Sequence, residues 1–277
     1  MNAYMMHNAQ KLMSSGHEQT YFLNGTSRAL PPVVFIHGFP HTHRLWDEQV
    51  QALSQHYTVI TYDLRGFGQS VGGEMNHSLD FYVSDLMALL DHLKIEKATI
   101  AGLSMGGYIA LRAISKFPDR IHALILADTS ADTDQNSAKL KRYELMTLLD
   151  QKGLEPFIDT FIKGVLLPTT LEKHPERLTQ LRAMMSENQP QALSGALAAM
   201  AGRLDSNDSL SAITVPTLIL VGEKDPSTPP ELAAKLHDKI KGSILVKIPH
   251  AGHLSNWENP DAFNHAVTEF LGRRFRE

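Results

Sequence analysis

The stretch Gly102-Leu103-Ser104-Met105-Gly106-Gly107 is the part of the chain that most strongly predicts its fold. It follows the apolar run Ala98-Thr99-Ile100-Ala101, which predicts a buried strand, and precedes Tyr108-Ile109-Ala110-Leu111-Arg112-Ala113, which predicts a helix. A sharp strand–turn–helix connection lifts one serine hydroxyl clear of the sheet edge, and glycines without Cβ atoms suit its flanks. The lysine and spacing of a phosphate-binding loop are absent, so the alternative is an ordinary glycine-rich connection.

Composition limits the class of protein. The chain of 277 residues is 43% hydrophobic, which suits one large α/β domain or a domain carrying an insertion. A net charge of −4 gives no reason to expect a nucleic acid or a membrane as partner. The lack of cysteine excludes disulfides, thiol nucleophiles and zinc–thiolate sites. No apolar run has the length of a signal peptide or a membrane span, so we expect a soluble, cytoplasmic protein.

Strand and helix patterns alternate along most of the chain. Buried strands are predicted before Ser104 and at residues 33–36, 57–62, 121–126, 215–221 and 244–248. Helices are predicted after Ser104 and at residues 79–93 and 262–270. This alternation indicates an α/β fold with a mostly parallel sheet covered on both faces. We expect the first roughly 20 residues to form either a flexible tail or a strap on the sheet edge.

The alternation stops between about residues 131 and 212, where only helical patterns occur, at 140–149, 156–165, 175–187 and 190–204. Pro156, Pro175 and Pro190 each suit the first turn of a helix, where a missing N–H costs little. We therefore expect a core formed by residues 1–130 and 213–277, with an inserted helical cap at residues 131–212.

A serine nucleophile needs a base within hydrogen-bond reach and an acid that orients the base. In a parallel sheet these partners are expected in loops that directly follow strands. Gly222-Glu223-Lys224-Asp225 follows one predicted strand, and Pro249-His250-Ala251-Gly252-His253 follows the next. Asp128 follows an earlier strand and is a second candidate acid, while His250 is a second candidate base.

Five segments, taken in order along the chain, resemble the α/β-hydrolase family from about residue 30 to the C-terminus. They are His37-Gly38-Phe39-Pro40, Asp63-Leu64-Arg65-Gly66-Phe67-Gly68-Gln69-Ser70, the Ser104 turn, Val215 through Asp225, and Gly252-His253 followed by Glu258 and Pro260. The resemblance implies the α/β-hydrolase fold, with Ser104 as nucleophile, His253 as base and Asp225 as orienting acid. It also implies an oxyanion hole formed by the N–H groups of Phe39 and Met105, and no cofactor.

Several other residues have a structural interpretation. His41 and His43 lack a third ligand at a matching spacing, so we expect no metal site. His37 is expected to brace its loop, Asp63 and Arg65 to be structural, and Glu223 to be a solvated neighbour of the acid. The apolar residues of the cap either line a pocket or form ordinary core: Met146, Phe157, Phe161, Met184, Met185 and Met200.

The resemblance implies hydrolysis of a small carboxylic ester or lactone through an acyl-enzyme. Serine at the turn argues against epoxide hydrolases and haloalkane dehalogenases, which carry aspartate there. The segments around Ser104 and His253 are most similar to the branch of 3-oxoadipate enol-lactonases and small carboxylesterases. Alternatives are a C–C bond hydrolase of ring-cleavage products, a cofactor-free haloperoxidase acting as a perhydrolase, and a ligand receptor on the same fold. Natural substrate and oligomeric state have no signature in the sequence.

Overall fold

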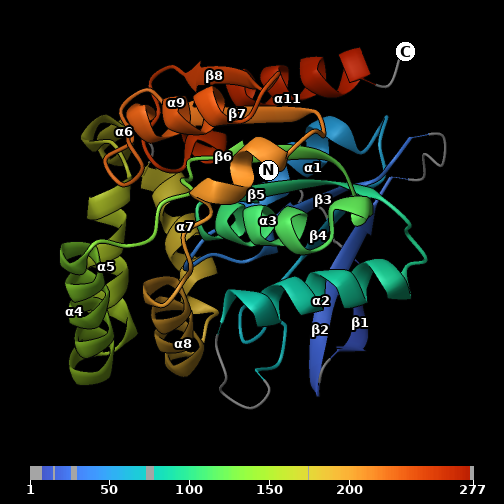
Figure 1. The fold of residues 1–277 in the computed structure, drawn as a ribbon. Helices are drawn as coiled ribbons and strands as arrows, with labels where there is room; N and C mark the ends of the chain where they lie inside the picture. The colour runs from blue at the N-terminus through green and yellow to red at the C-terminus, as the bar shows by residue number, and fades with distance from the viewer. Residues whose placement is uncertain (1–7, 15, 26–29, 73–77, 174, 275–277) are drawn as a thin grey trace.

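A twisted sheet forms the centre of the molecule (Figure 1). The computed structural model describes residues 8–14, 16–25, 30–72, 78–173 and 175–274. Within them the sheet has eight strands in the order β1-β2-β4-β3-β5-β6-β7-β8. Their bounds are β1 Ala9–Ser14, β2 His17–Asn24, β3 Val33–Ile36, β4 Val59–Tyr62, β5 Ala98–Leu103, β6 Ile121–Ala127, β7 Thr217–Gly222 and β8 Ile244–Ile248.

From β4 to β8 all neighbouring strands are parallel, whereas β2 pairs antiparallel with both β1 and β4. Strands β3, β4, β5 and β7 are buried along their whole length, as expected for apolar parallel strands with helices on both faces. This confirms the predicted α/β class. Residues 9–14 and 17–24 form the antiparallel edge pair β1–β2, so this part of the N-terminus is a strap on the sheet edge. Residues 1–7 lie outside the described part.

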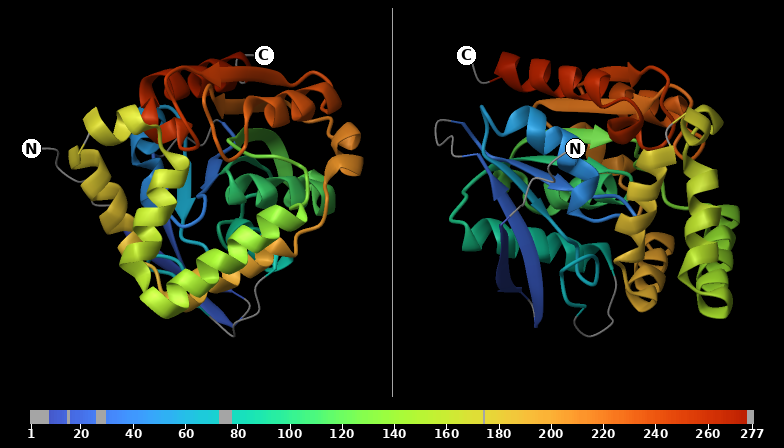
Figure 2. Two further views of the ribbon diagram at one scale, coloured as in Figure 1. Left: turned by 90° about the vertical axis from the view of Figure 1, so that its left-hand side faces the viewer. Right: turned by 180° about the vertical axis from the view of Figure 1, so that it is seen from behind.

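Helices cover both faces of the sheet (Figures 1 and 2). The helices α2 (Leu79–His92), α3 (Met105–Lys116) and α9 (Pro230–Lys239) lie on one face. The helices α1 (Asp47–Leu53), α10 (Ser255–Glu258) and α11 (Pro260–Arg274) lie on the other. Three short 3₁₀ helices join these elements in the described ranges: His43–Trp46, Pro118–Arg120 and Asn207–Ala212. None of the described helices combines the length and apolar composition that a bilayer crossing requires.

A group of helices inserted between β6 and β7 gathers at one end of the sheet (Figure 2). They are α4 Asn136–Lys152, α5 Leu154–Val165, α6 Pro168–Lys173, α7 Pro175–Ser186 and α8 Pro190–Ala201. The sequence pattern predicted four of these helices and missed α6, which is short and has no buried residue. Helix α4 packs against both α5 and α8, and the buried side chains of these helices belong to the same hydrophobic core as the sheet.

The turn at Ser104 has the strained geometry that its sequence predicts. Ser104 has a φ of +54°, a region that non-glycine residues rarely adopt. A Cβ on Gly102 would lie 2.2 Å from the carbonyl oxygen of Gly106, and a Cβ on Gly106 would lie 2.2 Å from that of Ile36. Backbone therefore occupies the space beside both glycines, and the turn closes only because neither carries a side chain.

We expect Gly102→Ala to lower the free energy of unfolding by about 3 kcal/mol, because the added methyl group meets backbone that cannot move aside. Urea denaturation followed by circular dichroism measures the change. Gly164→Ala is the matched control. Gly164 lies on helix α5, and a Cβ added there has no neighbouring atom within 4 Å. Unchanged stability in Gly102→Ala would contradict the close packing of the turn.

Candidate active site

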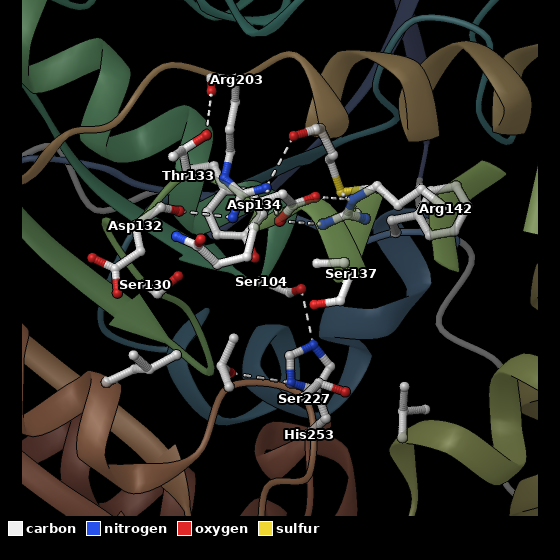
Figure 3. A pocket seen from close by; sticks show the side chains of 18 of the residues that line it. Ser104, Ser130, Asp132, Thr133, Asp134, Ser137, Arg142, Arg203, Ser227 and His253 are labelled. Carbon is white, nitrogen blue, oxygen red and sulfur yellow. Dashed lines mark hydrogen bonds and ion pairs between the residues drawn. The ribbon is translucent and has the colours of Figure 1, made fainter. Parts of the chain in front are cut away.

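Ser104, His253 and Asp225 meet at the carboxyl end of the sheet, in loops that follow β5, β8 and β7. Ser104 Oγ lies 2.9 Å from His253 Nε2, a contact that is drawn as a dashed line in Figure 3. His253 Nδ1 lies 2.8 Å from Asp225 Oδ2 and 3.0 Å from Asp225 Oδ1. The structure thus places the three predicted residues in one hydrogen-bonded line, with Nδ1–H donating to the carboxylate and Nε2 facing the serine hydroxyl.

The loop after β7 fixes the Asp225 carboxylate. Oδ1 accepts hydrogen bonds from the backbone N–H groups of Ser227 at 2.7 Å and Thr228 at 2.9 Å, and the Thr228 hydroxyl donates to Oδ2 at 2.7 Å. Burial raises the pKa of Asp225, but His253 and the bonds from Thr228 outweigh it and lower the pKa overall. Ser227 and Thr228 were not predicted from the sequence, although an aspartate with polar residues two and three positions later is typical of an Asx turn.

The pKa of His253 is set by opposing influences. Burial is the largest and lowers the pKa, while Asp225, helped by Asp128 and Glu258, raises it. The carboxylates prevail, so the pKa lies above its ordinary value of 6.5. An imidazole that lies next to a serine hydroxyl and is stabilised when protonated can accept and return a proton.

Phe39 and Met105, the residues predicted to form an oxyanion hole, both flank Ser104. Met105 is the first residue of α3, where a backbone N–H has no acceptor within the helix and the helix dipole favours negative charge. Phe39 lines the same cavity as Ser104. The adjacent Gly38 packs so closely that an added Cβ would lie 3.4 Å from the Cβ of Ser104.

His37 braces the Phe39 loop, as expected. Its Nε2 accepts a hydrogen bond from the N–H of Leu64 at 3.1 Å, and its Nδ1 lies 3.0 Å from the carbonyl oxygen of Gly38. These two contacts assign the ring proton to Nδ1, because Nε2 must be the acceptor. Burial lowers the pKa of His37 to about 4, so the ring stays neutral and links the two loops.

Asp63 and Arg65 have structural roles. Asp63 Oδ1 accepts from the backbone N–H of His43 at 2.7 Å and lies 2.8 Å from its Nδ1, while Oδ2 accepts from the N–H of Gln69 at 2.9 Å. Arg65 forms a buried two-bond pair with Asp85, at 2.8 and 2.7 Å. Both residues hold the loop that follows β4.

His41 is buried, and neither of its ring nitrogens has a hydrogen-bond partner among the described residues. Burial lowers its pKa to about 3, with His37 and His253 adding to the effect, so the ring is neutral. Its neighbour His43 is instead bound to Asp63. In the ranges that the structure describes, no group of three or more histidine, aspartate or glutamate side chains is arranged to hold a metal ion.

The alternative base and acid are bound to groups other than Ser104 and His253. His250 is exposed, and its N–H lies 3.4 Å from Glu223, which is itself exposed. Asp128 is buried, but it accepts hydrogen bonds from the N–H of Gly222 at 2.8 Å and from the N–H and hydroxyl of Ser255 at 3.0 and 2.6 Å. Asp128 therefore ties the loop after β7 to the segment after β8, which sequence reasoning missed.

The pKa of Asp128 is raised to about 8, first by burial and then by the nearby Asp225 carboxylate. The two carboxyl groups near His253 thus have pKa values shifted in opposite directions, because the pKa of Asp225 is lowered. Asp225 is the one that contacts Nδ1 of His253 and is stabilised as an anion.

A cavity of about 470 Å³ opens at Ser104 and His253. Of the apolar cap residues considered from the sequence, Phe161 and Met200 line it, whereas Phe157, Met184 and Met185 are buried in the core and Met146 packs against the core. Many polar residues also line it, and the sequence pattern did not single them out because no motif marks them: Ser130, Asp132, Thr133, Asp134, Gln135, Ser137, Arg142 and Arg203 (Figure 3).

Comparison with known proteins agrees with this architecture. A sequence profile described as the alpha/beta hydrolase fold matches residues 31–260. The chain belongs to the α/β-hydrolase family. This hydrolase is 31% identical to 3-oxoadipate enol-lactonase 2 of Acinetobacter baylyi, over 88% of its own length and 89% of the relative's. It is 30% identical to a putative non-heme chloroperoxidase of Synechocystis sp., over 87% and 91% of the two chains.

Solved structures that are similar to this chain include that of a thermophilic esterase from Thermogutta terrifontis with malate bound. That esterase is 33% identical to this hydrolase, with a TM-score of 0.91, over 98% of this chain and 100% of the other. The similarity confirms the predicted α/β-hydrolase fold and extends to both the sheet and the inserted helices.

Proposed function

We propose that this hydrolase cleaves carboxylic esters or lactones, with Ser104 as nucleophile, His253 as base and Asp225 as orienting acid. The observation that carries the proposal is the continuous line from the Ser104 hydroxyl through His253 to the Asp225 carboxylate, at the wall of a cavity. A serine hydroxyl becomes nucleophilic when such a base accepts its proton. The relatives named enol-lactonase and esterase support the same chemistry.

In the first step Ser104 Oγ attacks the carbonyl carbon and His253 Nε2 takes its proton. Asp225 stabilises the resulting imidazolium, and the N–H groups of Phe39 and Met105 stabilise the oxyanion. His253 then protonates the leaving alcohol, which stays attached to the acyl group when the substrate is a lactone. In the second step water attacks the acyl-enzyme, His253 takes the water proton and returns it to Ser104, and the carboxylic acid leaves.

A substrate panel tests the proposal. We expect turnover of p-nitrophenyl esters or of enol-lactones, together with covalent labelling by a fluorophosphonate that maps to the peptide containing Ser104. Selective turnover of vinylogous diketones would instead indicate C–C bond hydrolysis. Saturable ligand binding without turnover or labelling would indicate a receptor and would overturn the proposal.

Perhydrolysis is a second candidate, because one relative carries the name of a non-heme chloroperoxidase. In that reaction hydrogen peroxide replaces water in the attack on the acyl-enzyme and gives a peroxy acid. Peroxide-dependent formation of peroxy acid, measured beside ester hydrolysis in the same preparation, compares the two activities.

We expect kcat/KM for a neutral ester to fall as the pH decreases, with a midpoint above 6.5. The sign follows from the role of His253, since its raised pKa keeps the ring protonated up to a higher pH and a protonated ring cannot accept the proton of Ser104. A pH–rate profile at constant ionic strength measures the midpoint. A rate that is flat from about pH 5 to 8 would contradict the assignment of His253 as the base.

A further inference from the structure

Two arginines joined by one aspartate form part of the cavity wall. Arg142 lies on α4, Arg203 follows α8, and Asp134 precedes α4; all three line the cavity that contains Ser104. Arg203 Nη1 donates to Asp134 Oδ1 at 2.6 Å, Arg142 Nη2 donates to the same oxygen at 3.3 Å, and Arg142 Nε contacts Asp134 Oδ2. Figure 3 shows this arginine–aspartate cluster on the side of the cavity opposite His253, with Ser104 between them.

Arg203 is the fixed member of the cluster. Its side chain is 5% exposed, and its Nη atoms donate to the carbonyl oxygens of Met200 at 2.9 Å and Asp132 at 2.8 Å. Its guanidinium carbon lies 4.1 Å from the centroid of the Tyr108 ring, within the range of a cation–π contact. These contacts leave Arg203 as the anchor that positions Asp134.

Arg142 is less completely bound. Its side chain is 18% exposed, compared with 5% for Arg203. Of the hydrogen bonds that it forms within the described structure, two go to Asp134 and the third runs from Nη1 to the thioether sulfur of Met200 at 3.3 Å. A thioether is a weak acceptor, so this N–H is available for a better one.

The cluster carries an excess positive charge. Burial raises the pKa of Asp134, but Arg142 and Arg203 outweigh it and lower the pKa, so the group is a carboxylate. One carboxylate faces two guanidinium groups, which leaves one positive charge without a partner in the cavity wall. A partly buried charge without a counterion is unfavourable, and an anionic ligand group would offset this cost.

The neighbouring carboxylates do not supply that counterion. Asp132 forms an ion pair with Lys235 and accepts from Asn207 at 2.6 Å. Asp205 lines a second cavity, which Arg203 also borders, and there it accepts from Asn207, whose amide oxygen in turn accepts from Lys239 at 2.9 Å. These two acids are accompanied by two lysines, so the excess charge stays with the arginine–aspartate cluster.

We propose that Arg142 binds a carboxylate of the substrate, so that the preferred substrates are esters or lactones that also carry a free carboxylate group. The inference rests on the proposed function, because Ser104 and Arg142 line one cavity. A guanidinium group suits a carboxylate, since its planar N–H groups match the two oxygens and form charge-assisted hydrogen bonds. Arg203 and Asp134 act as positioning residues that hold Arg142 in place.

Matched pairs of substrates test the proposal. Monomethyl adipate, a half-ester with one free carboxylate, is compared with methyl adipamate, which replaces that carboxylate with a neutral amide of similar size. The acetyl ester of hydroxybutyrate and its amide form a second pair, in which the carboxylate lies on the alcohol portion. We expect kcat/KM to favour the anionic member of at least one pair by about 10-fold or more. The pair in which the anionic member is preferred shows whether the carboxylate lies on the acyl portion or on the alcohol portion of the substrate.

In Arg142→Gln, we expect kcat/KM for the anionic substrate to fall by about 10- to 100-fold, mainly through a higher KM, while the neutral substrate changes by less than about 3-fold. Arg120→Gln is the matched control for net charge. Arg120 lies beyond the far end of α3, where it pairs with Asp91. Its removal should leave the preference for the anion unchanged.

Calorimetric binding of adipate and of adipamide to the wild-type protein gives a readout independent of turnover and of any variant. We expect adipate to bind more tightly by about 10-fold. Equal kcat/KM within both pairs, equal binding of adipate and adipamide, or a preference that survives Arg142→Gln would overturn the proposal. A protein that binds adipate selectively but hydrolyses no ester would instead refute the proposed function while leaving the carboxylate site in place.

Discussion

Replacing Ser104 with alanine should lower kcat/KM for ester hydrolysis by about 10⁴-fold or more. The loss is large because nucleophile, base and acid act as one unit, so that removing the hydroxyl leaves His253 with nothing to activate. The N–H groups of Phe39 and Met105, which we propose as oxyanion donors, cannot replace a covalent step. Initial rates on a p-nitrophenyl ester, measured at equal concentrations of the purified folded proteins, give the change.

Ser115→Ala is the control for this substitution. It removes a hydroxyl from α3, the helix that begins directly after Ser104, at an exposed position near the other end of that helix. We expect unchanged hydrolysis and full labelling in Ser115→Ala, and neither in Ser104→Ala. Ester hydrolysis that persists in purified Ser104→Ala at more than a small fraction of the wild-type rate would rule out Ser104 as the nucleophile.

Asp225→Asn should lower kcat/KM by about 10⁴-fold although the two side chains have nearly the same shape. The carboxylate accepts the Nδ1 proton of His253, which leaves Nε2 free to accept from Ser104. An amide can donate to Nδ1 and favour the opposite tautomer, and it carries no charge to stabilise the imidazolium. The pH–rate midpoint of the residual activity should also decrease, because Asp225 is the main group that raises the pKa of His253.

Asp128→Asn is the matched comparison, since Asp128 is also buried near His253. Asp128 contacts Gly222 and Ser255, and burial with the nearby Asp225 raises its pKa to about 8. Its replacement should therefore reduce stability and disturb the two loops, with a much smaller loss of kcat/KM than Asp225→Asn. The opposite ranking of the two variants would assign the orienting role to Asp128, which is the alternative that the sequence leaves open.

Much of the fold could be predicted because its signals are local. The apolar runs of β3, β5 and β7 are buried along their whole length, so hydrophobicity alone marks them. The edge strand β1 is mostly exposed and carries Gln10 and Lys11, and its pairing with β2 is what makes it a strand. Helix α9 escaped prediction because it has few apolar residues and buries only Ala233 and Leu236.

The sequence by itself determined the strained turn at Ser104, since Gly102 and Gly106 allow a close approach of backbone segments that a residue with a Cβ would prevent. It also narrowed the base and the acid to two candidates each, because loops after parallel strands meet at one end of a sheet. Only the tertiary structure decided which acid contacts His253, because Asp128 and Asp225 both follow buried strands and differ in what their carboxylates meet. The polar cluster in the cavity wall likewise depends on packing. Arg142 lies on α4 and Arg203 follows α8, and the two arginines share Asp134 because these helices pack against each other.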